Sequence, residues 1–392
     1  MRMRPAIVAL AAVFVVAATP APASARVPKG FVGMMADGPI FGSHVNLAHQ
    51  LDVMVASGVE SLRVTFNWAG AQPFATFAGV PVAQRSSFQD VGGVPTQWSA
   101  IDNVVRLAAE RGLTVLPVVI YAPAWDAVPP ASAGSPPAAT DPYADFMTAL
   151  VDRYGPRGTF WTDNPQIPKD PIRMWQIWNE PNLIAYWSAQ PSVEGYVKLL
   201  SAAHAAVKAA DPGAKVVLAG LTNYSWEYLA QIYKVPGVRK LFDIAAVHPY
   251  TAMPQGVIEI IGLNRRVMNR NGDAHKPILV TETGWPSSLG KVPANQDYGF
   301  ATTEAGQARD IAALLPLLAA ARRRLDLLGF YLYTWIGHEY PGAYTFNYSG
   351  LFSFEFNRVL ATPAYGAFRR GALALEGCRK KGTLATVCVE PR

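Results

Sequence analysis

The feature that most constrains the fold of this chain is a regular alternation of short apolar runs with amphipathic stretches between residues 31 and 334. Short apolar runs are typical of buried strands, and the longer stretches between them have the apolar spacing of helices. The expected strands are Phe31–Ala36, Ser61–Phe66, Thr114–Ile120, Arg173–Trp178, Lys215–Ala219, Ile244–Val247, Pro277–Thr281 and Gly329–Thr334. Eight such repeats predict one α/β domain, a closed (β/α)₈ TIM barrel rather than an open sheet.

Helix starts and long loops refine this picture. One helix is expected to open at Asp141, as a capping carboxylate followed by proline, and another at Ser192. Two long irregular segments, Ala69–Thr96 and Ala122–Thr140, follow the second and third strands. A disordered linker between domains is the alternative, but consecutive barrel repeats flank each segment. Because both follow a strand, we expect both loops on the C-terminal face, where barrel active sites form.

Residues 1–25 have the composition of a secretory signal peptide. Two arginines precede the apolar run Ile7–Ala18, and an Ala-Ser-Ala cleavage site ends at Ala25. A transmembrane anchor is the alternative, but spanning a bilayer takes about 20 apolar residues, more than this run provides. We therefore expect a secreted protein with a barrel domain over residues 26–375 and a tail over residues 376–392.

The tail contains the chain's two cysteines, Cys378 and Cys388. In an exported protein this close, even pair predicts a disulfide, whereas two thiolates without a nearby histidine make a poor metal site. The net charge of +6 is moderate, and its basic clusters are not interleaved with aromatic residues as a nucleic-acid surface would be. We expect no nucleic-acid partner, no membrane segment once the signal is removed, and a monomer.

Two strand ends carry the residues that point to chemistry. The fourth expected strand runs into Trp178-Asn179-Glu180-Pro181, and the seventh runs into Thr281-Glu282-Thr283-Gly284-Trp285. A carboxylate directly after a buried strand is costly unless it faces the barrel mouth. These strands lie across the barrel from each other, so Glu180 and Glu282 can converge. Two facing carboxyl groups are what hydrolysis of a glycosidic bond requires, one to protonate the leaving oxygen and one to attack the anomeric carbon.

Both segments, in this order and on strands of this rank, resemble the catalytic segments of clan A of the glycoside hydrolases. Enzymes of that clan are retaining (β/α)₈ hydrolases with catalytic glutamates after strands four and seven. The resemblance extends over residues 31–373 and is similar in the first segment to family 39 and family 5 enzymes, and in the second to family 17 glucanases. It implies that Glu180 is the acid/base and Glu282 the nucleophile.

The same resemblance implies supporting roles for further residues. Asn179 is expected to hydrogen-bond the sugar 2-hydroxyl. Arg63 is expected to keep the nucleophile ionised, because an opposite charge within about 4–6 Å lowers the pKa of a carboxyl group. His248 and Tyr250 follow strand six, and the tyrosine is expected to hydrogen-bond the nucleophile. Trp335 is expected to form the floor of the −1 subsite, since sugars stack on aromatic rings.

The residues alone leave alternatives open for several of these positions. Arg63 in a structural ion pair and His248 as a satisfied core histidine are the competing interpretations. Tryptophans just past strand ends fit either sugar stacking or loop packing, and tyrosine and asparagine at two similar positions have less support. These residues are Trp68, Trp125, Trp187, Trp285, Tyr121 and Asn223.

The sequence therefore predicts a retaining O-glycoside hydrolase, or a transglycosylase using the same site, that acts on extracellular oligo- or polysaccharides. A carbohydrate-binding barrel that has lost catalysis is the alternative from another class, but both glutamates and their expected partners are present. A metal-dependent hydrolase would need a His-x-His or His/Asp cluster, which the six histidines do not form in the sequence. No nucleotide or redox motif occurs, so we expect no cofactor and no metal.

Overall fold

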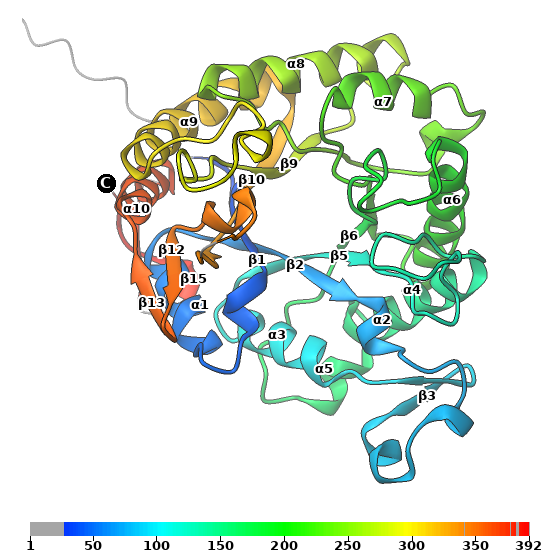
Figure 1. Cartoon of the computed structure of the whole chain (residues 1–392). Coiled ribbons are helices and arrows are strands. Elements are labelled where there is room, and N and C mark those ends of the chain that lie inside the picture. The colour runs from blue at the N-terminus through cyan, green and yellow to red at the C-terminus, as the bar shows by residue number, and fades with distance from the viewer. Residues whose placement is uncertain (1–26, 341, 377, 382–383, 392) are drawn as a thin grey trace, which may run out of the picture.

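The computed structural model describes residues 27–340, 342–376, 378–381 and 384–391, and it contains the predicted barrel (Figure 1). Eight strands form one parallel sheet in the order β7-β6-β5-β2-β1-β10-β9-β8. They are β1 (Val32–Ala36), β2 (Ser61–Asn67), β5 (Thr114–Ile120), β6 (Met174–Ile177), β7 (Lys215–Val217), β8 (Ala245–Val247), β9 (Ile278–Thr283) and β10 (Leu327–Leu332). Parallel bridges from Val217 to Ile244 and from Leu221 to Val247 join β7 to β8, so the sheet closes into a ring. All eight predicted strands are confirmed.

Helices surround this ring (Figure 1). The longer ones are α1 (Leu47–Ala56), α3 (Ser99–Ala109), α4 (Asp141–Tyr154), α6 (Val193–Ala210), α7 (Ser225–Ile232), α8 (Pro254–Arg270), α9 (Glu304–Leu325) and α10 (Pro363–Glu376). One large apolar core fills the space between the strands and the helices, and a smaller cluster that includes Leu116, Ile244 and Leu279 fills the ring itself. Because inward side chains fill the barrel, the open space lies only above the strand ends.

Two helix starts differ in detail from the prediction. The helix α4 begins at Asp141 as predicted, but Thr140 occupies the capping position and makes no side-chain cap. Asp141 lies in the first turn instead, where its charge complements the helix dipole. Helix α6 follows Ser192, whose hydroxyl is 2.6 Å from that of Tyr228 rather than bonded to the helix end.

The two long segments after the second and third strands are folded. The first contains α2 (Trp68–Ala71) and the hairpin of β3 (Gln89–Val91) and β4 (Val94–Thr96), which projects from the barrel in Figure 1. A bridge between Ala127 and Pro137 closes the second segment on itself. Both follow the C-terminal ends of strands, as predicted. Neither lines the central cavity described below.

The remaining α-helix and strands lie outside the ring of eight strands. They are α5 (Thr159–Asp163), the three-stranded sheet of β11 (Ile336–Gly337), β12 (Phe352–Glu355) and β13 (Arg358–Ala361), and the pair β14 (Cys378–Lys381) and β15 (Leu384–Pro391). The expected signal peptide and the side chains of Cys378 and Cys388 lie outside the described residues, so both predictions stay untested. Within the described part of the chain, no helix has the length and hydropathy needed to cross a membrane.

Candidate active site

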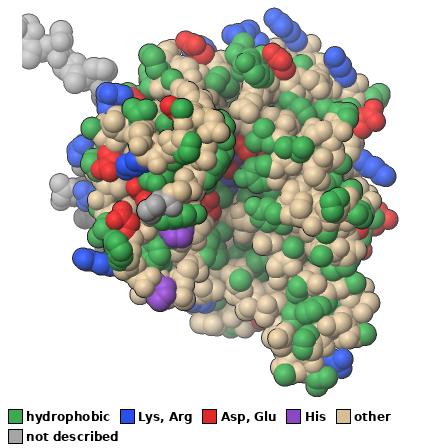
Figure 2. All heavy atoms as spheres, in the orientation of Figure 1, with side chains coloured by type: hydrophobic (Ala, Val, Ile, Leu, Met, Phe, Trp, Pro, Cys, Tyr) green, Lys and Arg blue, Asp and Glu red, His purple; other side chains and the backbone are tan. Residues whose placement is uncertain are grey.

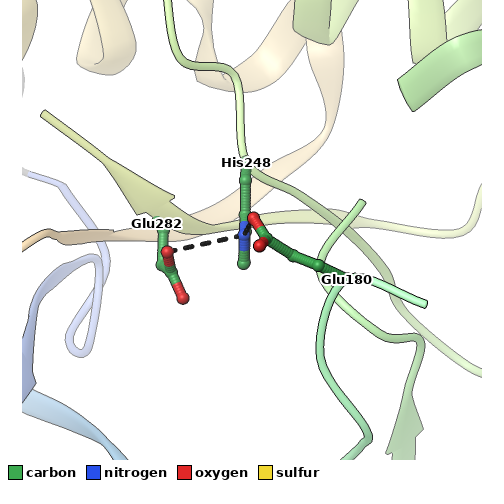
Figure 3. Close-up of side chains that lie close together, drawn as sticks. All are labelled: Glu180, His248 and Glu282. Carbon is green, nitrogen blue, oxygen red and sulfur yellow. Dashed lines mark hydrogen bonds and ion pairs between the residues drawn. The ribbon is translucent and has the colours of Figure 1, made fainter. Parts of the chain in front are cut away.

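The chain positions Glu180 by leaving strand geometry abruptly at the end of β6. Trp178 and Glu180 both have positive φ, at 67° and 39°. Each such non-glycine residue costs about 1–3 kcal/mol, which surrounding contacts must offset. The backbone N–H of Glu180 donates to Gly220 O at 3.0 Å, and the indole N–H of Trp178 donates to Tyr186 O at 2.8 Å. This turn directs the Glu180 side chain toward the side chain of Glu282, as Figure 3 shows.

Glu282 is held as a carboxylate by hydrogen bonds to both of its oxygens. Arg63 Nη1 donates to Oε1 at 2.6 Å, and the hydroxyl of Tyr250 donates to Oε2 at 2.9 Å. Burial works to raise the pKa of Glu282, but the charges of His248 and Arg63 and these hydrogen bonds together lower it below its usual value. Hydrogen bonds and opposite charges favour the ionised form. Glu282 is therefore suited to act as a nucleophile.

Arg63 is the third residue of β2 and is buried, and each of its three guanidinium nitrogens makes a hydrogen bond. Its Nε donates to Gln176 Oε1 at 2.6 Å and its Nη2 donates to Asn179 Oδ1 at 2.7 Å, in addition to the ion pair with Glu282. Because the amide oxygen of Asn179 accepts from Arg63, its NH₂ group is left to donate elsewhere. Asn179 also lines the cavity. Arginine thus orients two residues of the site with one planar group.

The pKa of Glu180 is shifted in the opposite direction to that of Glu282. Burial raises its pKa, and the charge of Glu282 adds to this effect, while a hydrogen bond and the charge of His248 oppose it. The pKa of Glu180 is raised overall, so this carboxyl group holds its proton more readily than Glu282 does. His248 Nδ1 lies 2.7 Å from Glu180 Oε1. Two carboxyl groups with pKa values moved in opposite directions have the character of an acid and a nucleophile.

The spacing of the two glutamates is short. One oxygen of Glu180, one oxygen of Glu282 and one ring nitrogen of His248 all lie within 4.8 Å of one another. Retaining glycosidases have carboxyl groups about 5–5.5 Å apart, whereas inverting enzymes need about 6.5–9.5 Å to admit a water molecule. The separation therefore fits direct attack by a carboxylate on the substrate.

His248 lies between the two glutamates, a contact that the sequence spacing did not reveal. Its Nε2 is buried and has no partner among the described residues. Gly220 makes room for the ring, because a Cβ at that position would lie 1.9 Å from Nε2. The three groups could ligate a divalent cation. However, Arg63 already neutralises Glu282 and occupies one of its oxygens, which favours acid–base chemistry over metal binding.

A cavity of about 970 Å³ opens above these groups. Figure 2 shows the hollow near the centre of this face, with acidic side chains visible inside it. Tyr121 and Asn223 line it, at the mouth positions predicted for them. One wall is aromatic and consists of Tyr250, Tyr298, Phe300, Tyr333, Tyr344 and Phe346. The rings of Tyr250 and Phe300 stack at 5.5 Å, and rings of this kind suit the apolar faces of sugars.

The tryptophans do not lie where the sequence analysis expected. Trp335 is fully buried, donates to Gln50 Oε1 at 2.9 Å and packs on Phe352. It does not line the cavity, so its predicted role as a subsite floor is wrong. Tyr333, two residues earlier, lines the cavity instead.

The other four candidate tryptophans also pack against protein side chains, three of them buried and Trp125 partly exposed. Trp68 stacks in an aromatic cluster that includes Trp125, and Trp125 donates its indole N–H to Gln72 O. Trp285 is buried and donates to Thr251 O, and Trp187 is buried against Trp178. None of the four lines the cavity. The packing interpretation holds for each. Beyond the end of a strand, the direction of a side chain depends on its tertiary contacts and not on the strand.

Asp37 is a cavity residue that the sequence analysis missed. It follows β1 directly, lines the cavity and accepts a hydrogen bond from Thr334 Oγ1 at 2.6 Å. Burial raises the pKa of Asp37 to about 6, although the hydrogen bond from Thr334 opposes this. The signal that identified Glu180 and Glu282, a carboxylate at a strand end, was present here too.

Comparison with known proteins adds the fold family. No family model and no curated protein matches the chain. Solved structures do match. A family 39 glycoside hydrolase from the gut symbiont Bacteroides cellulosilyticus WH2 has a TM-score of 0.63 at 17% identity, over 90% of this chain and 65% of that one. A monomeric beta-xylosidase from Caulobacter crescentus CB15 has a TM-score of 0.58 at 16% identity, over 87% and 67%.

The GH53 catalytic domain from Ignisphaera aggregans is similar over nearly its whole length. Its TM-score is 0.58 at 22% identity, and the match covers 90% of this chain and 98% of that domain. The chain thus spans about two thirds of the length of the first two proteins and almost all of this single domain. With the closed eight-stranded barrel, these likenesses show that the chain has the (β/α)₈ fold of the clan A glycoside hydrolases.

Proposed function

We propose that this chain is a retaining O-glycoside hydrolase that cleaves oligo- or polysaccharides through a covalent glycosyl-enzyme. One observation carries the proposal: two buried glutamates within 4.8 Å, one with a raised and one with a lowered pKa, at the bottom of a large cavity. The likeness to glycoside hydrolases of several families supports it. The sugar and the linkage are left open by this argument.

In the first step, Glu282 attacks the anomeric carbon while the bond to the leaving oxygen breaks. Glu180 gives its proton to that oxygen, so the aglycone leaves as a neutral alcohol. The lowered pKa favours the ionised form of Glu282, and the raised pKa favours the protonated form of Glu180, as the first step requires. The NH₂ group of Asn179 is free to donate to the substrate, which fits the hydrogen bond to the sugar 2-hydroxyl expected from the resemblance.

In the second step, Glu180 is a carboxylate and takes a proton from water. The resulting hydroxide oxygen attacks the anomeric carbon and displaces Glu282, which restores both groups to their starting states. Arg63 and Tyr250 stabilise the charge that returns to Glu282, through contacts of 2.6 and 2.9 Å. A sugar hydroxyl in place of water would give transglycosylation, which product analysis distinguishes from hydrolysis.

The unequal roles of the glutamates provide the test. Glu282→Ala removes the first step for every substrate. Glu180→Ala impairs poor leaving groups severely, whereas activated aryl glycosides still glycosylate the enzyme without acid help. Azide, which needs no general base, should then accelerate deglycosylation in Glu180→Ala and give a product of retained configuration. Azide with Glu282→Ala should give the inverted product, because it replaces the nucleophile itself.

Two results would contradict this scheme. The opposite azide stereochemistry in the two variants would exchange the roles of Glu180 and Glu282. Full activity in both variants would remove the catalytic assignment altogether. Incubation with a chelator serves as a control for the cluster of Glu180, His248 and Glu282. We expect unchanged rates, and a loss that is reversed by added Zn²⁺ would support a metal-dependent reaction instead.

We also propose that the protein is exported, acts outside the cell as a monomer, and contains a Cys378–Cys388 disulfide. The support comes from the sequence, namely the signal-like composition of residues 1–25 and the close pair of cysteines. N-terminal sequencing of secreted protein should start near Arg26. Thiol titration of unfolded, unreduced protein should find no free thiol, and light scattering should give the mass of one chain.

A further inference from the structure

Asp37 is a third carboxyl group in the cavity, and the proposed mechanism does not use it. Its side chain is partly exposed, toward the cavity that it lines. Thr334 Oγ1 donates to its Oδ1 at 2.6 Å, and the hydroxyl of Tyr333 also hydrogen-bonds to it. An ionised carboxylate accepts up to about four hydrogen bonds. Two hydroxyl donors therefore leave acceptor capacity for a ligand.

The cavity residues that the structure describes offer no free arginine or lysine to a charged sugar. Among the described lining residues, Arg63 is the only arginine or lysine. Its guanidinium group is buried and is already hydrogen-bonded to Glu282, Gln176 and Asn179. His338 is the only histidine among the lining residues described, and it is exposed. A uronic acid would bring its carboxylate into a cavity with three carboxyl groups and no unpaired arginine or lysine among these residues.

Around the barrel, Asp37 lies closer to the strand of Glu282 than to the strand that leads to Glu180. Its strand β1 is two strands from β9, which carries Glu282, and three strands from β6, which leads to Glu180. Glu180 protonates the leaving oxygen in the proposed function, so the aglycone lies on its side. The sugar ring attached to Glu282 therefore extends its hydroxyl groups toward the wall formed by β1 and β10.

We propose that Asp37 is a specificity-determining residue that accepts hydrogen bonds from hydroxyl groups of the glycone and makes the site select uncharged sugars over uronic acids. This inference rests on the proposed function and names the substrate class for the same site. A hydroxyl that donates to a charged acceptor is worth about 1.5–3 kcal/mol, or roughly 10- to 150-fold in rate. Removing either the sugar hydroxyl or the Asp37 carboxylate should lower the rate by that factor. Removing both should lower it little further.

The experiment compares the wild type with Asp37→Asn, which keeps the shape and removes the charge. The substrates are the 4-nitrophenyl glycoside that the wild type cleaves fastest, its monodeoxy analogues and the matching uronide. In the wild type, at least one deoxy analogue should lose about 10- to 100-fold in kcat/KM, and in Asp37→Asn the same analogue should lose less than about 3-fold. The ratio of kcat/KM for the uronide to kcat/KM for the neutral glycoside should rise in the variant.

Two controls make the comparison specific. Asp126→Asn changes another carboxyl group whose pKa burial raises to about 6, but one that does not line the cavity, so its kinetics should match the wild type. Asp37→Ser provides a second neutral variant if Asp37→Asn folds poorly. Equal deoxy penalties in wild type and variants, or an unchanged uronide ratio, would overturn the inference alone. A wild type that cleaves none of the glycosides would overturn the proposed function, and this inference with it.

Discussion

Replacing Arg63 by methionine tests the electrostatic basis of the site most directly. Arg63 is 1% exposed and touches Glu282, Gln176 and Asn179 through separate nitrogen atoms. Methionine fills a similar volume without charge or donors. The substitution leaves Glu282 in its buried position with Tyr250 and His248 as remaining partners. It should affect both the ionisation of the nucleophile and the stability of the fold.

The magnitudes follow from these contacts. An opposite charge at this range lowers the pKa of a carboxyl group by about 1–3 units, and each unit corresponds to about 1.4 kcal/mol. Because the pKa of Glu282 is lowered in the wild type, its active ionised form persists to lower pH than usual. The acid limb of kcat/KM should therefore move up by about 1–3 pH units in Arg63→Met. Breaking one side of a buried ion pair also costs about 3–5 kcal/mol of stability.

Linkage gives the sign of the effect on stability. A carboxyl group with a lowered pKa in the folded state contributes stability above its unfolded pKa, and that contribution is lost as the pH falls through the folded pKa. The wild type should therefore lose stability on acidification through this range. Arg63→Met should lose less stability over the same pH range, because the pKa of Glu282 in its folded state is closer to the unfolded value.

The assay combines the pH profile of kcat/KM for an aryl glycoside with urea unfolding of Arg63→Met, Glu282→Gln and the double variant. The double variant should be more stable than the sum of the single changes predicts, by about 0.5–3 kcal/mol. Arg111→Met is the matched control, since Arg111 makes an ion pair of the same length, 2.6 Å, with Asp52, whose side chain is 33% exposed. It should cost about 0–1 kcal/mol and leave kinetics unchanged. If the acid limb did not move and the stability changes of the single variants were additive, Arg63 would not stabilise the ionised form of Glu282.

Three further changes probe the surroundings of the glutamates. Gly220→Ala should lower kcat/KM by about 100-fold or more, chiefly for poor leaving groups, because the new Cβ would displace His248 from Glu180; equal rates would argue against this contact. Trp335→Ala should lower the free energy of unfolding in urea by about 3–5 kcal/mol but leave KM for aryl glycosides unchanged, since the ring is buried. A raised KM with unchanged stability would show that the ring contacts the substrate. Tyr298→Ala should weaken polysaccharide binding and spare aryl glycosides, because this ring is 53% exposed at the cavity wall; isothermal titration with oligosaccharides measures the difference.

The sequence by itself determined the barrel and the two glutamates. Strands buried on both faces must be apolar, so β5 and the first half of β9 are continuous apolar runs. Such runs can be recognised in the sequence without knowing which strands pair with them. Glu180 and Glu282 end such runs, where a buried charge is too costly unless it faces the mouth. The ranks of their strands then place them in one cavity. The contact of Arg63 with Glu282 was expected only from the resemblance to clan A enzymes, and the structure contains it.

Only the tertiary structure decided which side chains around the glutamates reach the cavity. Strand β10 ends at Leu332, and beyond that point Tyr333 faces the cavity while Trp335 packs against Phe352 in the core. Alternation along a strand fixes side-chain direction only while the strand continues. Past its end, direction depends on packing with loops distant in sequence. The same reason applies to His248, which meets Glu180 only because Gly220, on a third segment of the chain, leaves space for its ring.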